Sequence, residues 1–139
     1  MADREFIEQQ KTHIENTLSS LEPVSDGMSQ KEQAGTATFL MNIYSGIENI
    51  LRIIIEEDTG EKIRKSEAWH KELLAKSVEK GVISAGLKDV LMEYLKFRHL
   101  HIHGYGYMLE WEEFRSLAIN ARATVEKFFN EMKNGGYCR

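Results

Sequence analysis

The helical spacing of apolar residues between positions 30 and 57 constrains the fold more than any other feature of the sequence. Eight apolar side chains recur there at short helical intervals: Phe39, Leu40, Ile43, Ile47, Ile50, Leu51, Ile54 and Ile55. Such intervals place side chains on one broad face of an α-helix. Ser29 is a suitable N-cap, and Gly60 in the segment EDTGE suits a helix end. The sequence therefore predicts a long amphipathic helix from about 30 to 57.

The same period recurs along the rest of the chain. Further helices are predicted at 3–21, ending near Pro23; from Ser66 to Gly81; from Ser84 into Arg98; and from about Glu110 to Met132. No useful run of alternating apolar and polar residues indicates a strand. The fold prediction is all-α, a bundle of four long helices plus one short helix. Residues 1–139 form one domain, with a disordered tail at 133–139.

Composition and charge narrow the function classes. The formal net charge is −4, so any RNA contact must come from a local basic site rather than from a global positive field. The single Cys138 cannot form an internal disulfide and is compatible with a reducing compartment. No apolar signal region follows Met1, and no apolar run is long enough to span a membrane. The expectation is a cytoplasmic protein without membrane partners.

The segment FRHLHIHGYGY, residues 97–107, combines an arginine with three histidines and two tyrosines. Arg98 continues the apolar stripe of its helix, where an arginine is costly unless it is paired or functional; a salt-bridged arginine at the rim of the core is the alternative. His99 and His103 have the spacing of a helical zinc pair. No HExxH glutamate lies between them, and His70 is isolated in the sequence and offers no third ligand, so no metal is expected.

Arg98, His103 and Tyr105 form the pattern R-x4-H-x-Y, which resembles the motif of HepT-type toxins of the HEPN superfamily. The resemblance extends in helix order over about 30–130. It implies a HEPN-type helical bundle and a metal-independent ribonuclease toxin that acts as a homodimer and needs no cofactor. It also implies a type VII-like pair, in which a cognate minimal nucleotidyltransferase antitoxin silences the toxin by AMPylation at Tyr105.

The residue types suit RNA cleavage. The 2′-hydroxyl of RNA can attack the neighbouring phosphate if a base removes its proton and an acid protonates the leaving oxygen. His103 can act as acid or base near neutral pH, and Arg98 can bind the non-bridging oxygens. Residues five apart on a straight helix differ in direction by about 140°, so two motif helices crossing at a two-fold axis are expected to complete one cleft. An AMP on Tyr105 would add negative charge and bulk beside His103.

Several alternatives remain open at this stage. The chain could be a catalytically inactive HEPN helical module that binds a nucleotidyltransferase, as its acidic charge favours, or an unrelated bundle. Tyr105 could be a rim tyrosine packed on the last helix. Glu48 could pair with Arg98 from a facing helix, but a solvent-facing glutamate is the favoured interpretation. Glu48 is therefore left out of the predicted catalytic set.

Overall fold

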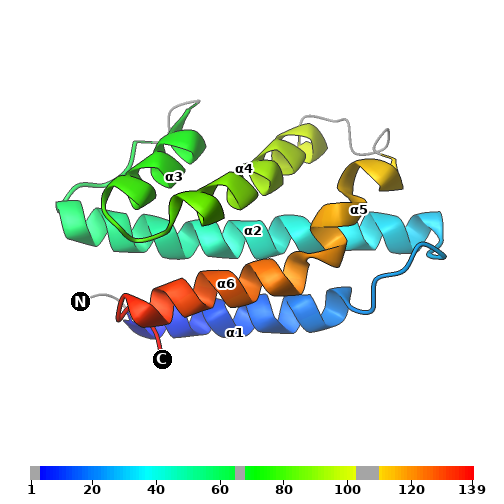
Figure 1. Cartoon of the computed structure of the whole chain (residues 1–139), viewed down its shortest axis with the longest axis horizontal. Coiled ribbons are helices and arrows are strands. Elements are labelled where there is room, and N and C mark those ends of the chain that lie inside the picture. Colours follow the sequence, from blue (N-terminus) through cyan, green and yellow to red (C-terminus); the bar gives the residue numbers. More distant parts are fainter. Residues whose placement is uncertain (1–3, 65–67, 103–109) are drawn as a thin grey trace.

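The computed structural model describes residues 4–64, 68–102 and 110–139, and within these ranges every regular element is helical. The helices are α1 (Arg4–Leu21), α2 (Gln30–Thr59), α3 (Trp69–Glu79), α4 (Ala85–Leu100), α5 (Trp111–Ile119) and α6 (Ala121–Asn134). Helix α2 runs the length of the bundle, with α1 and α6 on one side and α3 and α4 on the other (Figure 1). The predicted all-α bundle is confirmed. In the ranges described, no helix is both long enough and apolar enough to cross a membrane.

Helix α2 begins and ends close to the predicted positions because its local sequence supplies both caps. The Ser29 hydroxyl accepts a bond from the Glu32 backbone N–H at 3.1 Å, and the Glu32 carboxylate accepts one from the Ser29 N–H at 2.9 Å. This capping box satisfies two amides at the helix start. At the other end, Gly60 has a φ of 73°, and its N–H bonds to the Glu56 carbonyl.

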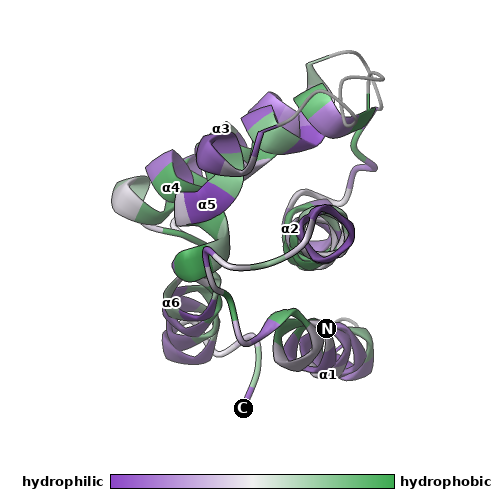
Figure 2. Ribbon diagram, turned by 90° about the vertical axis from the view of Figure 1, so that its right-hand side faces the viewer, coloured by the Kyte–Doolittle hydropathy of each residue, from purple (hydrophilic) through white to green (hydrophobic). Residues whose placement is uncertain are grey.

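The amphipathic faces of the helices build one core around α2, which contacts α1, α3, α4 and α5. Figure 2, looking along the bundle, shows that α1, α2 and α6 each carry hydrophobic and hydrophilic residues on different sides. Helix α1 approaches α2 closely at Gly46, where an added Cβ would lie 2.7 Å from Cγ1 of the fully buried Ile14. The missing side chain therefore permits this close helix contact.

The predicted final helix, from about Glu110 to Met132, is two helices in the structure. Asn120 separates α5 from α6, and Figure 1 shows α5 steeply inclined to α6. The Tyr94 hydroxyl donates to the Leu117 carbonyl at 2.8 Å, a carbonyl that a continuous helix would offer to the N–H of Ala121. The Asn120 side chain also donates to the Ser116 carbonyl at 2.8 Å. These competing bonds account for the break, so the described parts of the chain form six helices rather than the five predicted.

The short helix and its successor agree with the predicted pattern where the structure describes them. Ser66, the predicted start, lies outside the described residues; the observed α3 begins at Trp69, and Gly81 follows it with a φ of 73°. Ser84 is the N-cap of α4, and its hydroxyl accepts the Leu87 N–H at 3.1 Å. The turn between α3 and α4 is therefore encoded locally, as predicted.

The C-terminal segment differs from the expected disordered tail. Helix α6 continues to Asn134, and Cys138 is only 3% exposed. The Lys11 ammonium donates to the Arg139 carbonyl at 2.9 Å, and the Arg139 N–H donates to the Glu8 carboxylate at 3.1 Å. The last residues thus pack against α1. The buried thiol of Cys138 and the two bonds to Arg139 hold them there, although a glycine-rich turn precedes them.

Candidate functional site

Arg98 lies near the end of α4 on the buried side of the helix. It is half-buried, and its Nε is buried without a hydrogen-bond partner among the described residues. Its Nη1 lies 3.4 Å from Nε2 of His70 on α3. The stem of the side chain is thus enclosed by protein, while the terminal nitrogens reach a polar neighbour. The prediction that Arg98 continues the apolar stripe and must be paired or functional fits this geometry.

His70 connects Arg98 to a buried carboxylate on a third helix. Its Nδ1 lies 2.6 Å from Oε2 of Glu48 on α2, and Glu48 is only 5% exposed. A neutral imidazole with its proton on Nδ1 satisfies both contacts, since Nδ1–H donates to the carboxylate and Nε2 accepts from the guanidinium. A proton on Nε2 would instead face the arginine cation. We call Glu48, His70 and Arg98 the relay cluster.

Two interpretations made from the sequence are wrong here. Glu48 does not face solvent; it occupies a buried row of α2 with Tyr44, Leu51 and Ile55. His70 looked isolated in the sequence, yet it links that glutamate to Arg98. Glu48 therefore supports Arg98 through an imidazole rather than by the direct pair considered above.

Tyr44 lies one turn before Glu48 and extends the polar cluster into the core. It is 1% exposed, and its hydroxyl lies beside the Glu48 carboxylate but outside hydrogen-bonding geometry with any described residue. Burial, and next the negative charge of Glu48, raise the pKa of Tyr44 far above its usual value. The phenol therefore stays protonated, and Glu48 is the single anion near the Arg98 charge within this cluster.

The relay cluster holds a fixed positive charge at the end of a helix. The Glu48 carboxylate and the Arg98 guanidinium compensate each other's charge across the imidazole of His70. The 2.6 Å contact between Glu48 and His70 restricts the orientation of that ring. Beyond Leu100 the chain continues through a wider π-helical turn at residues 101–102. The prediction for the direction of His103 assumed a straight α-helix from Arg98 onward. Among the described residues, that geometry holds only as far as Leu100.

The other predicted site residues, His103 and Tyr105, lie outside the described residues. Of the predicted pair for catalysis, only Arg98 has a described position. The structure adds Glu48 and His70 beside it, which sequence reasoning had weighed and set aside or judged isolated. A usable signal existed, because Glu48 interrupts an apolar row of α2 just as Arg98 interrupts that of α4.

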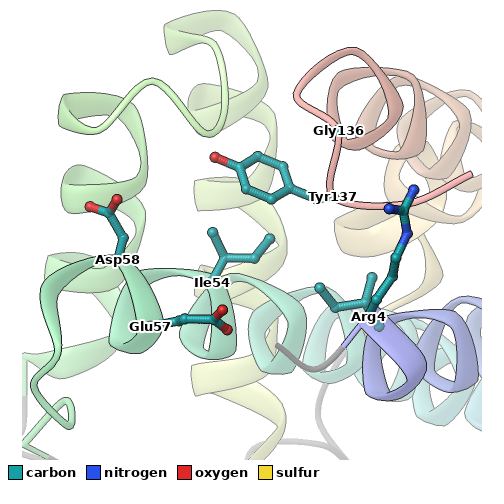
Figure 3. Close-up of a pocket in the computed structure, with 7 residues that line it drawn as sticks. Arg4, Ile54, Glu57, Asp58, Gly136 and Tyr137 are labelled. Atoms are coloured by element: carbon teal, nitrogen blue, oxygen red, sulfur yellow. The ribbon is translucent and has the colours of Figure 1, made fainter. Parts of the chain in front are cut away.

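The described ranges contain no group of three or more histidine, cysteine, aspartate or glutamate side chains that could hold a metal ion. A separate hollow of about 440 Å³ lies where α1 begins and α2 ends (Figure 3). Its wall mixes Arg4 with Glu57 and Asp58, and Tyr137 covers one side. It shares no residue with the relay cluster, so the two are distinct features of the bundle.

Comparison with known families agrees with this architecture. The model of the family described as HepT-like protein matches residues 35–135, which cover α2 from residue 35 onward, all of α3 to α6 and all three members of the relay cluster. The comparisons with curated proteins and with solved structures gave no significant match. With most of its length matched and an all-helical HEPN-type bundle, this chain belongs to the HepT-like protein family.

Proposed function

We propose that this chain is the metal-independent endoribonuclease toxin of a type VII-like toxin–antitoxin pair. Family membership supports the coarser statement that it is a HEPN-type toxin module. The observation that most supports the catalytic role is Arg98 itself. Its guanidinium is held at the end of α4 by His70, which is in turn held by the buried Glu48. An arginine preorganised in this way can bind phosphate oxygens with little reorganisation.

The reaction follows from the groups proposed. A base removes the proton of the ribose 2′-hydroxyl, the 2′-oxygen forms a bond to phosphorus, and the bond from phosphorus to the 5′-oxygen breaks. That oxygen receives a proton, so the products are a 2′,3′-cyclic phosphate and a free 5′-hydroxyl. His103 supplies the acid–base function, and Arg98 stabilises the additional negative charge on the crowded phosphate. Each copy of a homodimer contributes one Arg98 and one His103 to the shared cleft.

Regulation is proposed to act at Tyr105. A minimal nucleotidyltransferase partner transfers AMP from ATP to the tyrosine hydroxyl: the tyrosine oxygen bonds to the α-phosphorus, its proton is lost, and pyrophosphate leaves. The added phosphodiester brings negative charge close to His103 in sequence, where it would repel substrate phosphate. Intact mass of protein co-expressed with that partner measures the addition, which Tyr105→Phe should abolish. If Tyr105→Phe protein gains AMP as efficiently as wild type, the assignment of Tyr105 is wrong.

The central experiment is RNA cleavage by purified protein in the presence of a chelator. Wild type should cut RNA and leave DNA of the same sequence intact, whereas Arg98→Ala and His103→Ala should each lose most of the activity, by about 10²-fold or more. A cyclic phosphate on the product would identify the attacking group. If wild-type protein leaves RNA intact, and its expression is as harmless as that of His103→Ala, the nuclease proposal fails and the inactive binding module is favoured.

A further inference from the structure

A groove between α3 and α4 lies directly beside Arg98. It encloses about 570 Å³ and is lined mainly by apolar surface, with Met92 and Leu95 in its wall. Leu100 also lines it and is 41% exposed. This volume is within the range of small-ligand sites and is large enough for a nucleobase with its ribose.

The groove is basic although the whole chain is acidic. His70, Lys71, Lys96 and His99 line it, and no carboxylate is among its described lining residues. The net charge of the chain is −4, so the positive charge that Lys71 and Lys96 give the groove is opposite in sign to that of the molecule as a whole. Such a patch attracts a polyanion.

The lysines are free enough to bind a new anion. Lys96 is 71% exposed and contacts Glu93 at 3.3 Å, in a pair whose carboxylate is also 59% exposed. Exposed pairs of this kind contribute little, so a phosphate can replace Glu93. Lys71 is likewise exposed. An apolar floor with lysines at its rim matches the chemistry of single-stranded RNA, whose bases are planar and apolar on their faces and whose phosphates are negative.

The position of the groove relates it to the proposed reaction. His70 forms part of the groove wall and contacts Arg98 through Nε2 at 3.4 Å. A nucleotide in the groove would therefore lie next to a phosphate bound at Arg98. Taking the proposed nuclease function as given, we infer that the groove between α3 and α4 binds the base of a nucleotide adjoining the cleaved phosphate, with Lys71 and Lys96 on the flanking phosphates.

The test uses binding of an uncleavable RNA, so that it does not depend on catalysis. A fully 2′-O-methylated oligoribonucleotide is titrated against full-length wild type, Lys71→Ala, Lys96→Ala and the double variant at several salt concentrations. Each single variant should weaken binding by about three-fold to ten-fold. Each should also reduce the slope of log K against log salt by about 0.7, the value for one lost phosphate contact on a single strand.

Lys76→Ala is the matched control, because Lys76 is exposed on the same helix, loses the same charge and does not line the groove. It should bind like wild type. Photo-crosslinking with an RNA that carries 4-thiouridine next to the cleavage position should attach the base to peptides of α3 or α4. Crosslinks confined to other helices, or unchanged affinity of the double variant, would overturn the inference.

The outcomes separate this inference from the proposed function. If wild type cuts RNA but the groove variants bind as well as Lys76→Ala does, the groove assignment fails and the nuclease stands. If wild type binds the probe through the groove but never cuts RNA, the nuclease fails and the groove stands. If the lysine variants change only the oligomeric state in sedimentation, a protein covers the groove and the inference is overturned.

Discussion

Replacement of Glu48 by alanine should destabilise the protein strongly. Glu48 is 5% exposed, and its hydrogen bond to His70 is 2.6 Å long. Its removal leaves the Arg98 cation without the anion that compensates it across His70, and breaking a buried ion pair in this way costs about 3–5 kcal/mol. Arg98 is only half-buried, so water relieves part of this cost and the lower end, about 3 kcal/mol, is expected. Glu48→Gln keeps an acceptor for Nδ1–H and should cost only about 1–2 kcal/mol.

Urea unfolding near neutral pH, followed by far-ultraviolet circular dichroism, measures these differences. Glu93→Ala is the control, since that carboxylate is exposed on α4 and its loss should cost less than about 1 kcal/mol. A double-mutant cycle with Glu48→Ala and His70→Ala should give a coupling free energy of about 2 kcal/mol. A coupling below about 0.5 kcal/mol would show that the short contact contributes nothing specific and would refute the relay cluster as an energetic unit.

Three further predictions concern the bundle. Gly46→Ala should destabilise by about 1–3 kcal/mol in urea unfolding, because the new Cβ would clash with buried α1, whereas Gly35→Ala on the same helix meets nothing within 4 Å and should stabilise by about 0.5–1 kcal/mol. Ser84→Ala removes the N-cap of α4 and should lower stability in the same assay by about 1 kcal/mol. Hydrogen bonds, first from Arg115 and then from Trp111, lower the pKa of Asp26 to about 2. The stability that this carboxylate contributes should therefore be present above pH 4 and lost as the pH falls through 2. NMR titration of its carboxyl carbon measures the pKa, and an ordinary value would contradict this.

The helices were predictable because local information determines them. The period of α2, the cap at Ser29 and the left-handed Gly60 all act within a few residues, and the structure confirms each of them. The break at Asn120 was not predictable in the same way. It depends on the hydroxyl of Tyr94, which reaches the Leu117 carbonyl from 23 positions earlier in the chain. The helical spacing of residues 110–132 contains no sign of that bond, so it predicts one continuous helix.

The candidate site shows the same division. The unusual position of Arg98 was visible because a charge interrupts an apolar stripe. Glu48 carried the equivalent signal on α2, yet its pairing with His70 spans 22 positions and depends on how α3 packs. His70 does not interrupt an apolar row in this way, so nothing in the sequence marks it as their partner. Two opposite charges within apolar rows of separate helices are therefore a reason to search for a third, neutral residue between them.

The packed C-terminal segment gives the molecule a built-in chemical reporter. Cys138 is the sole cysteine of the chain, it is 3% exposed, and burial raises the pKa of its thiol. Thiolate is the reactive form, so an alkylating reagent can modify this sulfur only after the final residues detach from α1. The rate of alkylation would therefore time the opening of that end of the bundle in unlabelled, wild-type protein.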